Sequence, residues 1–93
     1  MSFRDMQLFN EKFPRYLRTV RKVRRLTQQE LSHVAQLDYK HLQSLESVHE
    51  LKDPRISTIH KLSIALQVPT HDLIAHCFDE DKRPTVDPPG RAV

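Results

Sequence analysis

The stretch TQQELSHVAQLDYKHLQSLE, from Thr27 to Glu46, contains neither glycine nor proline. Nothing in its composition prevents it from forming one continuous helix. On a helical wheel at about 100° per residue, its apolar side chains fall on one face. These side chains are Leu31, Val34, Ala35, Leu42 and Leu45. Hydrophobic periodicity alone therefore does not distinguish one long helix from two short ones.

Two residues argue against a single helix. Asp38 would lie within the apolar stripe, where an unpaired buried carboxylate is costly. Leu37 would point about 120° away from the stripe, into water. Both conflicts disappear if one helix ends near Ala35 and Asp38 caps the start of the next, accepting hydrogen bonds from its first amides. The stretch is therefore predicted to form two helices.

The start of the first of these helices has its own signal, because Thr27 and Glu30 have the spacing of a capping box. Upstream, a basic amphipathic helix is predicted from Pro14, which suits a first helical turn, to about Arg25. Its apolar positions are Leu17, Val20 and Val23.

Two further helices are predicted after the turn at Asp53-Pro54. The first ends at Val68-Pro69, and Thr70 caps the second. Their apolar positions are Ile56, Ile59, Leu62, Ile64, Ala65 and Leu66, then Leu73, Ile74, Cys77 and Phe78. The predicted fold is therefore all-α.

Ninety-three residues are enough for one small domain. Residues 1–12 are predicted to be an N-terminal arm, with or without a short helix, and residues 13–78 a compact domain of five helices. Residues 79–93 are polar, contain three prolines and are predicted to be a disordered tail. The single cysteine excludes an internal disulfide and favours a cytoplasmic protein, and no membrane span or signal peptide is expected.

The basic residues are unevenly distributed. The net charge is only +3, but seven basic residues and no acid lie between Lys12 and Arg25. Such a band suits a nucleic-acid partner, and it also suits an ordinary solvated helix face. Of its members, Arg18, Lys22, Arg24 and Arg25 are expected to be surface charges that aid electrostatic attraction.

The broken stretch reads Leu26-Thr27-Gln28-Gln29-Glu30-Leu31-Ser32, then Gln36-Leu37, the cap Asp38, and Leu42, Leu45 and Glu46. It resembles the helix-turn-helix of the Xre or phage repressor–Cro family. The run DPRISTIHKLSIALQVPTHDLI, residues 53–74, resembles the family's last two helices, so the likeness spans about Leu17 to Phe78. Gln36 departs from the family, which often has glycine at the turn, and the loop after Ser47 is longer than usual.

The resemblance implies a phage-repressor-like domain that binds double-stranded DNA as a homodimer on a palindromic operator and regulates transcription as a repressor or autoregulator. In that family the second helix reads bases in the major groove. Base-reading positions here are then Tyr39, Lys40, Gln43 and Ser44. Phosphate-binding positions are Gln28 and Gln29 at a helix N-terminus, with Lys52 and Arg55 in the later loop.

The same resemblance implies that Arg21 and Glu46 form a structural ion pair that does not contact DNA. Two dimer surfaces remain open, the apolar N-terminal arm and the last helix, and either set of apolar residues would equally complete a small core. The last-helix candidates are Leu73, Ile74 and Phe78.

No catalytic motif is visible, so an enzyme is not expected. His33, His41 and His49 recur every eight residues, which is not the spacing of a zinc site, so no metal or cofactor is predicted. The alternative function is a protein-interaction module, such as the antitoxin of a toxin–antitoxin pair, with DNA binding secondary. Fold alone does not choose between them.

Overall fold

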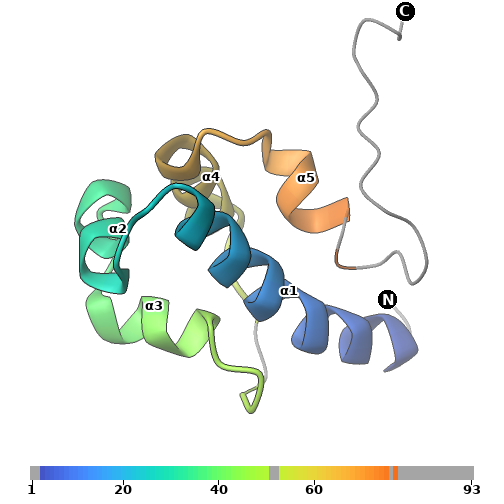
Figure 1. Cartoon of the computed structure of the whole chain (residues 1–93). Coiled ribbons are helices and arrows are strands. Elements are labelled where there is room, and N and C mark those ends of the chain that lie inside the picture. The colour runs from blue at the N-terminus through green and yellow to red at the C-terminus, as the bar shows by residue number, and fades with distance from the viewer. Residues whose placement is uncertain (1–2, 51–52, 76, 78–93) are drawn as a thin grey trace, which may run out of the picture.

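The computed structural model describes residues 3–50, 53–75 and 77, and these residues form five helices and no strand. The helices are α1 (Phe3–Val23), α2 (Gln28–Ala35), α3 (Tyr39–Leu45), α4 (Ile56–Leu66) and α5 (Thr70–Ala75). The short helices α2 to α5 gather beside the C-terminal half of α1 (Figure 1). The predicted all-α class is thus confirmed. Lys52, Phe78 and the predicted tail, 79–93, lie outside the described residues.

The opening stretch is two helices, as predicted. Gln36 ends α2 in the left-handed conformation, with φ 57° and ψ 46°, and the amide of Leu37 donates to the carbonyl of Ser32 at 2.9 Å. The Asp38 carboxylate accepts hydrogen bonds from the amides of Lys40 and His41 at 3.1 and 3.3 Å. The carboxylate that would have been buried in one long helix therefore caps the second of two.

The capping box at the start of α2 is also confirmed. The amide of Glu30 donates to Thr27 Oγ1 at 3.0 Å, and the amide of Thr27 donates to Glu30 Oε1 at 2.8 Å. Two backbone N–H groups that a helix start leaves without a carbonyl are thereby satisfied.

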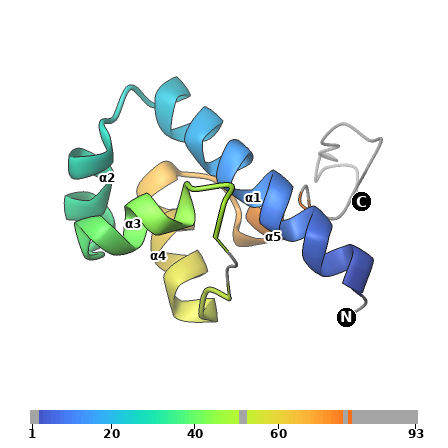
Figure 2. The same ribbon diagram turned by 90° about the horizontal axis from the view of Figure 1, so that it is seen from below.

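The prediction of an arm that ends before a helix starting at Pro14 is wrong. Helix α1 is continuous from Phe3 to Val23 with Pro14 inside it. A proline there removes one helical hydrogen bond and crowds the preceding turn. Burial offsets this cost, because Phe13 and Pro14 are fully buried and the ring of Phe9 stacks on that of Phe13 with centroids 4.9 Å apart. The N-terminal turns of α1 extend past the other helices (Figure 2).

The core receives side chains from all five helices. Its members are Phe13, Leu17, Leu31, Ala35, Leu42, Leu45, Ile59, Leu62, Leu66, Leu73 and Cys77. Four residues expected on apolar faces are instead exposed: Val23, Val34, Ile56 and Ile64. Among the described residues, no helix has both the length and the apolar character needed to cross a membrane.

Cys77, in the core, and Tyr16, which packs against it, both have a raised pKa. Burial raises the pKa of the Cys77 thiol to about 12, although the charge of Lys12 acts in the opposite direction. The Cys77 Sγ donates to the carbonyl of Leu73. Burial first, and then the charge of Asp72, raise the pKa of Tyr16.

Helices α1, α2 and α4 end in the same way, without glycine. Arg25, Gln36 and Gln67 each have a left-handed backbone, with φ of 62°, 57° and 60°. In each case the next residue is apolar, donates its amide back to the helix and packs against the core. This is the hydrogen-bond pattern and the apolar contact of the Schellman motif.

Arg24, in the turn that follows α1, completes the C-terminal end of α4. Its Nε donates to the carbonyl of Leu66 at 2.6 Å and its Nη2 to that of Gln67 at 3.2 Å. A cation at this end opposes the partial negative charge of the helix dipole. Arg24, expected to be only a surface charge, thus joins the turn after α1 to the end of α4.

Candidate nucleic-acid interface

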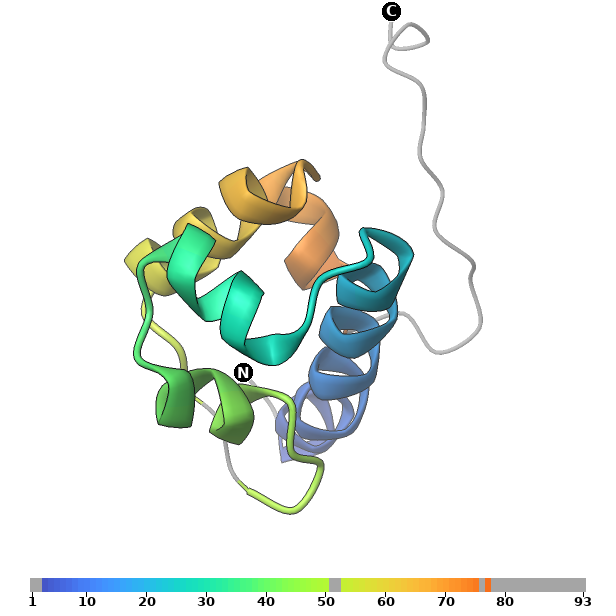
Figure 3. The same cartoon turned by 60° about the vertical axis from the view of Figure 1, so that its left-hand side comes forward.

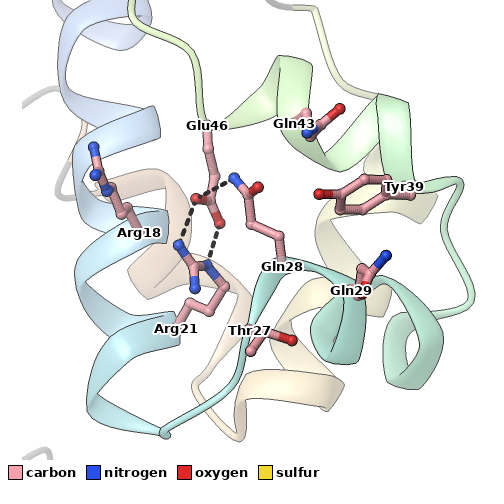
Figure 4. A pocket seen from close by; sticks show the side chains of 8 residues that line it. All are labelled: Arg18, Arg21, Thr27, Gln28, Gln29, Tyr39, Gln43 and Glu46. Atoms are coloured by element: carbon pink, nitrogen blue, oxygen red, sulfur yellow. Dashed lines mark hydrogen bonds and ion pairs between the residues drawn. The ribbon is translucent and has the colours of Figure 1, made fainter.

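A buried polar cluster joins α1 to both helices of the opening stretch (Figure 4). Arg21 Nε donates to Glu46 Oε2 at 2.7 Å, and its Nη2 donates to Glu46 Oε1 at 3.0 Å. Its Nη1 donates to the carbonyl of Leu26 at 2.8 Å. Gln28, the first residue of α2, donates from Nε2 to Glu46 Oε1 at 3.0 Å. One carboxylate therefore receives hydrogen bonds from α1 and α2 at the C-terminal end of α3.

The Arg21–Glu46 contact in this cluster is buried and directional. Arg21 and Glu46 are each only 8% exposed, so their charges are largely removed from water. A forked arginine–carboxylate contact of this kind is directional as well as strong. Asp38 holds the other end of α3 by capping it. Helix α3 is therefore fixed at both ends, and its orientation relative to α1 and α2 is set by side chains.

An open groove lies between α1, α2 and α3, with a volume of about 590 Å³. Figure 4 shows Arg18 on the α1 side, Gln29 on α2, and Tyr39 and Gln43 on α3. The remaining lining residues are Arg21, Thr27, Gln28 and Glu46. Because its lining is polar, the groove suits a hydrogen-bonding partner better than an apolar ligand.

The predicted base-reading residues are on the side of α3 that faces away from the core. Leu42 and Leu45 are buried, whereas Tyr39, Lys40 and Gln43 are exposed. Tyr39 and Gln43 line the groove. Ser44 is half-buried, and its hydroxyl donates to a carboxylate oxygen of Glu50, in the segment after α3.

The predicted phosphate-binding residues are more scattered. Gln28 and Gln29 share the groove, but the amide of Gln28 is engaged with Glu46. Arg55 is exposed at the N-cap of α4, is not among the residues that line the groove, and makes no capping hydrogen bond with its side chain. Lys52 lies outside the described residues. The structure therefore brings together only part of this predicted set.

Sequence reasoning missed two residues near α3. Arg18 lies three residues before Arg21, so both project from one face of α1 toward the groove. That spacing was a usable signal. Glu50 had no such signal, because its position beside Ser44 depends on the path of the loop.

The described residues contain no group of three or more His, Cys, Asp or Glu side chains placed to hold a metal ion.

Comparison of the chain with models of known protein families, with curated protein sequences and with solved structures finds no significant match.

Proposed function

We propose that the protein is a sequence-specific double-stranded DNA-binding transcriptional regulator of the phage-repressor type. The observation that carries this proposal is that α3 is held at both ends. The Arg21–Glu46–Gln28 cluster holds its C-terminal end, and Asp38 caps its N-terminal end. A short helix held in this way presents a rigid outward face. Such a face is what a helix needs to enter the major groove in a fixed orientation.

In this proposal two exposed residues of α3 read base edges, and a third contacts the DNA backbone. Lys40 donates to O6 and N7 of guanine, and Gln43 forms paired hydrogen bonds with adenine. Tyr39 contacts the sugar–phosphate backbone beside the groove that it lines. The exposure of these three side chains supports this assignment.

Phosphate contacts provide affinity and register in this proposal. Gln29, exposed near the start of α2, and Arg18, across the groove, are the donors beside α3. Arg55 adds a third donor at the N-terminus of α4, where the first helical turn contains no acidic residue. Helix N-termini attract anions because their free amides and dipole point outward. Gln28 acts mainly by holding Glu46.

We assign the proposed homodimer surface to the N-terminal turns of α1. The other candidate is weaker, because Leu73 is fully buried in the core and Ile74 is partly buried against it. Phe3 and Met6, in contrast, are 73% and 44% exposed. A dimer would bind two half-sites of a palindromic operator about one helical turn apart.

The test is selection of duplexes from a random pool by the full chain, followed by fluorescence anisotropy of the selected duplex at several salt concentrations. We expect affinity to fall steeply as salt rises, because each phosphate contact releases counterions. Gln43→Ala should relax base preference, whereas Arg55→Ala should weaken all duplexes alike. Arg15→Ala, an equal charge loss at an exposed site outside the groove, is the control. Failure to bind any duplex at low salt would contradict the proposal.

One observation favours a second candidate function, a protein-interaction module of the antitoxin type. Ile56 and Ile64 on α4 are 74% and 64% exposed, which is unusual for large aliphatic side chains. A protein partner would bury them. Under this alternative, Ile56→Ser with Ile64→Ser abolishes partner binding and leaves the DNA affinity unchanged.

A further inference from the structure

Glu50 lies beside the proposed reading helix although it belongs to the segment that follows it. The segment leaves α3 and turns back beside it at the edge of the molecule (Figure 3). Within it, the amide of His49 donates to the Ser47 hydroxyl at 3.2 Å. The Ser44 hydroxyl then donates to Glu50 Oε1, which places an exposed carboxylate against the C-terminal half of α3.

This carboxylate changes the chemistry of the reading face. Lys40 presents only donors, and Gln43 presents both donors and acceptors. The short side chain of Ser44 uses its proton on Glu50, so the group presented to a ligand beyond it is an acceptor. Acceptors of this kind pair with donors on base edges.

We infer that Glu50, positioned by Ser44, is a specificity-determining residue that selects cytosine at one position of each half-site. The inference rests on the proposed function. In the major groove cytosine offers the N4 amino donor, which carboxylates accept. Thymine and guanine present acceptors there, which a carboxylate repels. Adenine presents N7 next to its amino group, so part of its edge is repelled as well.

The negative charge of Glu50 increases the discrimination against duplexes that lack cytosine. A carboxylate near DNA is repelled by phosphates and loses water when the interface forms. A base-edge donor compensates for that loss, in addition to the hydrogen bond that Glu50 receives from Ser44. Duplexes without cytosine at the right position are therefore bound more weakly, whereas a neutral residue at position 50 would tolerate several bases.

The experiment selects duplexes from a random pool with four full-length proteins: wild type, Glu50→Gln, Ser44→Ala and Glu11→Gln. Glu11→Gln is a matched control, because it removes the same charge at an exposed site on α1. We expect wild type and Glu11→Gln to select one cytosine that Glu50→Gln does not. Changing that cytosine pair to a thymine pair should weaken wild type about ten-fold and Glu50→Gln much less. Ser44→Ala should show an intermediate loss.

The outcomes separate the two proposals. If wild type binds no duplex, the proposed function fails and this inference fails with it. If wild type binds selectively but Glu50→Gln selects the same bases with the same discrimination, only the role of Glu50 is overturned. A thermal unfolding curve for each variant distinguishes a change in base preference from loss of folded protein.

Discussion

Arg21 donates from three guanidinium nitrogens, two to the carboxylate of Glu46 and one to the carbonyl of Leu26. Lysine has no planar fork, so it would keep the charge but lose the paired contact. The residue therefore acts through its shape as much as through its charge. Its buried position means that any replacement leaves Glu46 with fewer partners in a site largely closed to water.

We predict that Arg21→Met lowers the free energy of unfolding by about 3–5 kcal/mol, because it leaves the buried carboxylate of Glu46 without its cation. Adding Glu46→Leu should recover part of this loss, since the unpaired charge is then removed as well. Urea unfolding of the two single variants and the double variant measures the coupling. Strict additivity of the two losses would show that the pair does not interact.

At the scale of elements, the left-handed ends of α1, α2 and α4 are places where stability can be gained. Gln36→Gly should raise the free energy of unfolding by about 1 kcal/mol, because glycine takes this conformation without the clash of a Cβ atom. Gln29→Gly is the control, since it replaces the same side chain inside α2 and should lower stability by a similar amount. Thermal unfolding of both variants tests the difference. Destabilisation by Gln36→Gly would contradict the prediction.

At the start of α4, a substitution that increases stability should weaken the proposed DNA binding. Arg55 is at its N-cap without a capping hydrogen bond from its side chain. Arg55→Asp should stabilise the protein by about 1 kcal/mol by accepting hydrogen bonds from the first amides. The same change should weaken binding to every duplex, because it replaces a phosphate donor with a repelled carboxylate. Thermal unfolding and anisotropy measure the two effects. DNA affinity equal to that of wild type would remove Arg55 from the interface.

Local signals explain which elements the sequence predicted correctly. Thr27 with Glu30, and Asp38 with the amides that follow it, act within three residues, so spacing reveals them. The continuity of α1 was missed because Pro14 also suits a first helical turn, and only the packing around it shows that burial offsets the lost hydrogen bond. The position of Glu50 was missed for a related reason, because it depends on a loop whose path no short-range pattern encodes.

At the scale of the whole molecule, stability should decrease in alkali. The folded state raises the pKa of Cys77 to about 12 and raises that of Tyr16. The folded protein thus holds protons that the unfolded chain releases above its ordinary thiol and phenol pKa values. Stability is therefore complete below about pH 8 and falls as pH rises, by at most about 1.4 kcal/mol per pH unit for each group.

Urea unfolding at pH 8 and pH 10 measures this decrease. Cys77→Ala should reduce the pH dependence even though it loses some core packing at both pH values. Cys77→Val keeps more of the packed volume and should show the same reduced pH dependence. An unchanged difference between the two pH values in both variants would assign the effect to other groups.

The continuity of α1 has a consequence for the spacing of the proposed operator. Phe3 and Met6, assigned to the dimer surface, and Arg21, which holds α3, are carried by one helix. A flexible arm would let the two reading helices of a dimer adjust independently. A continuous helix instead couples their separation and phase to the number of residues between Met6 and Arg21. One inserted residue would turn the proposed dimer surface by about 100° and move it by about 1.5 Å. In the proposed dimer, the length of α1 would therefore set the distance between half-sites.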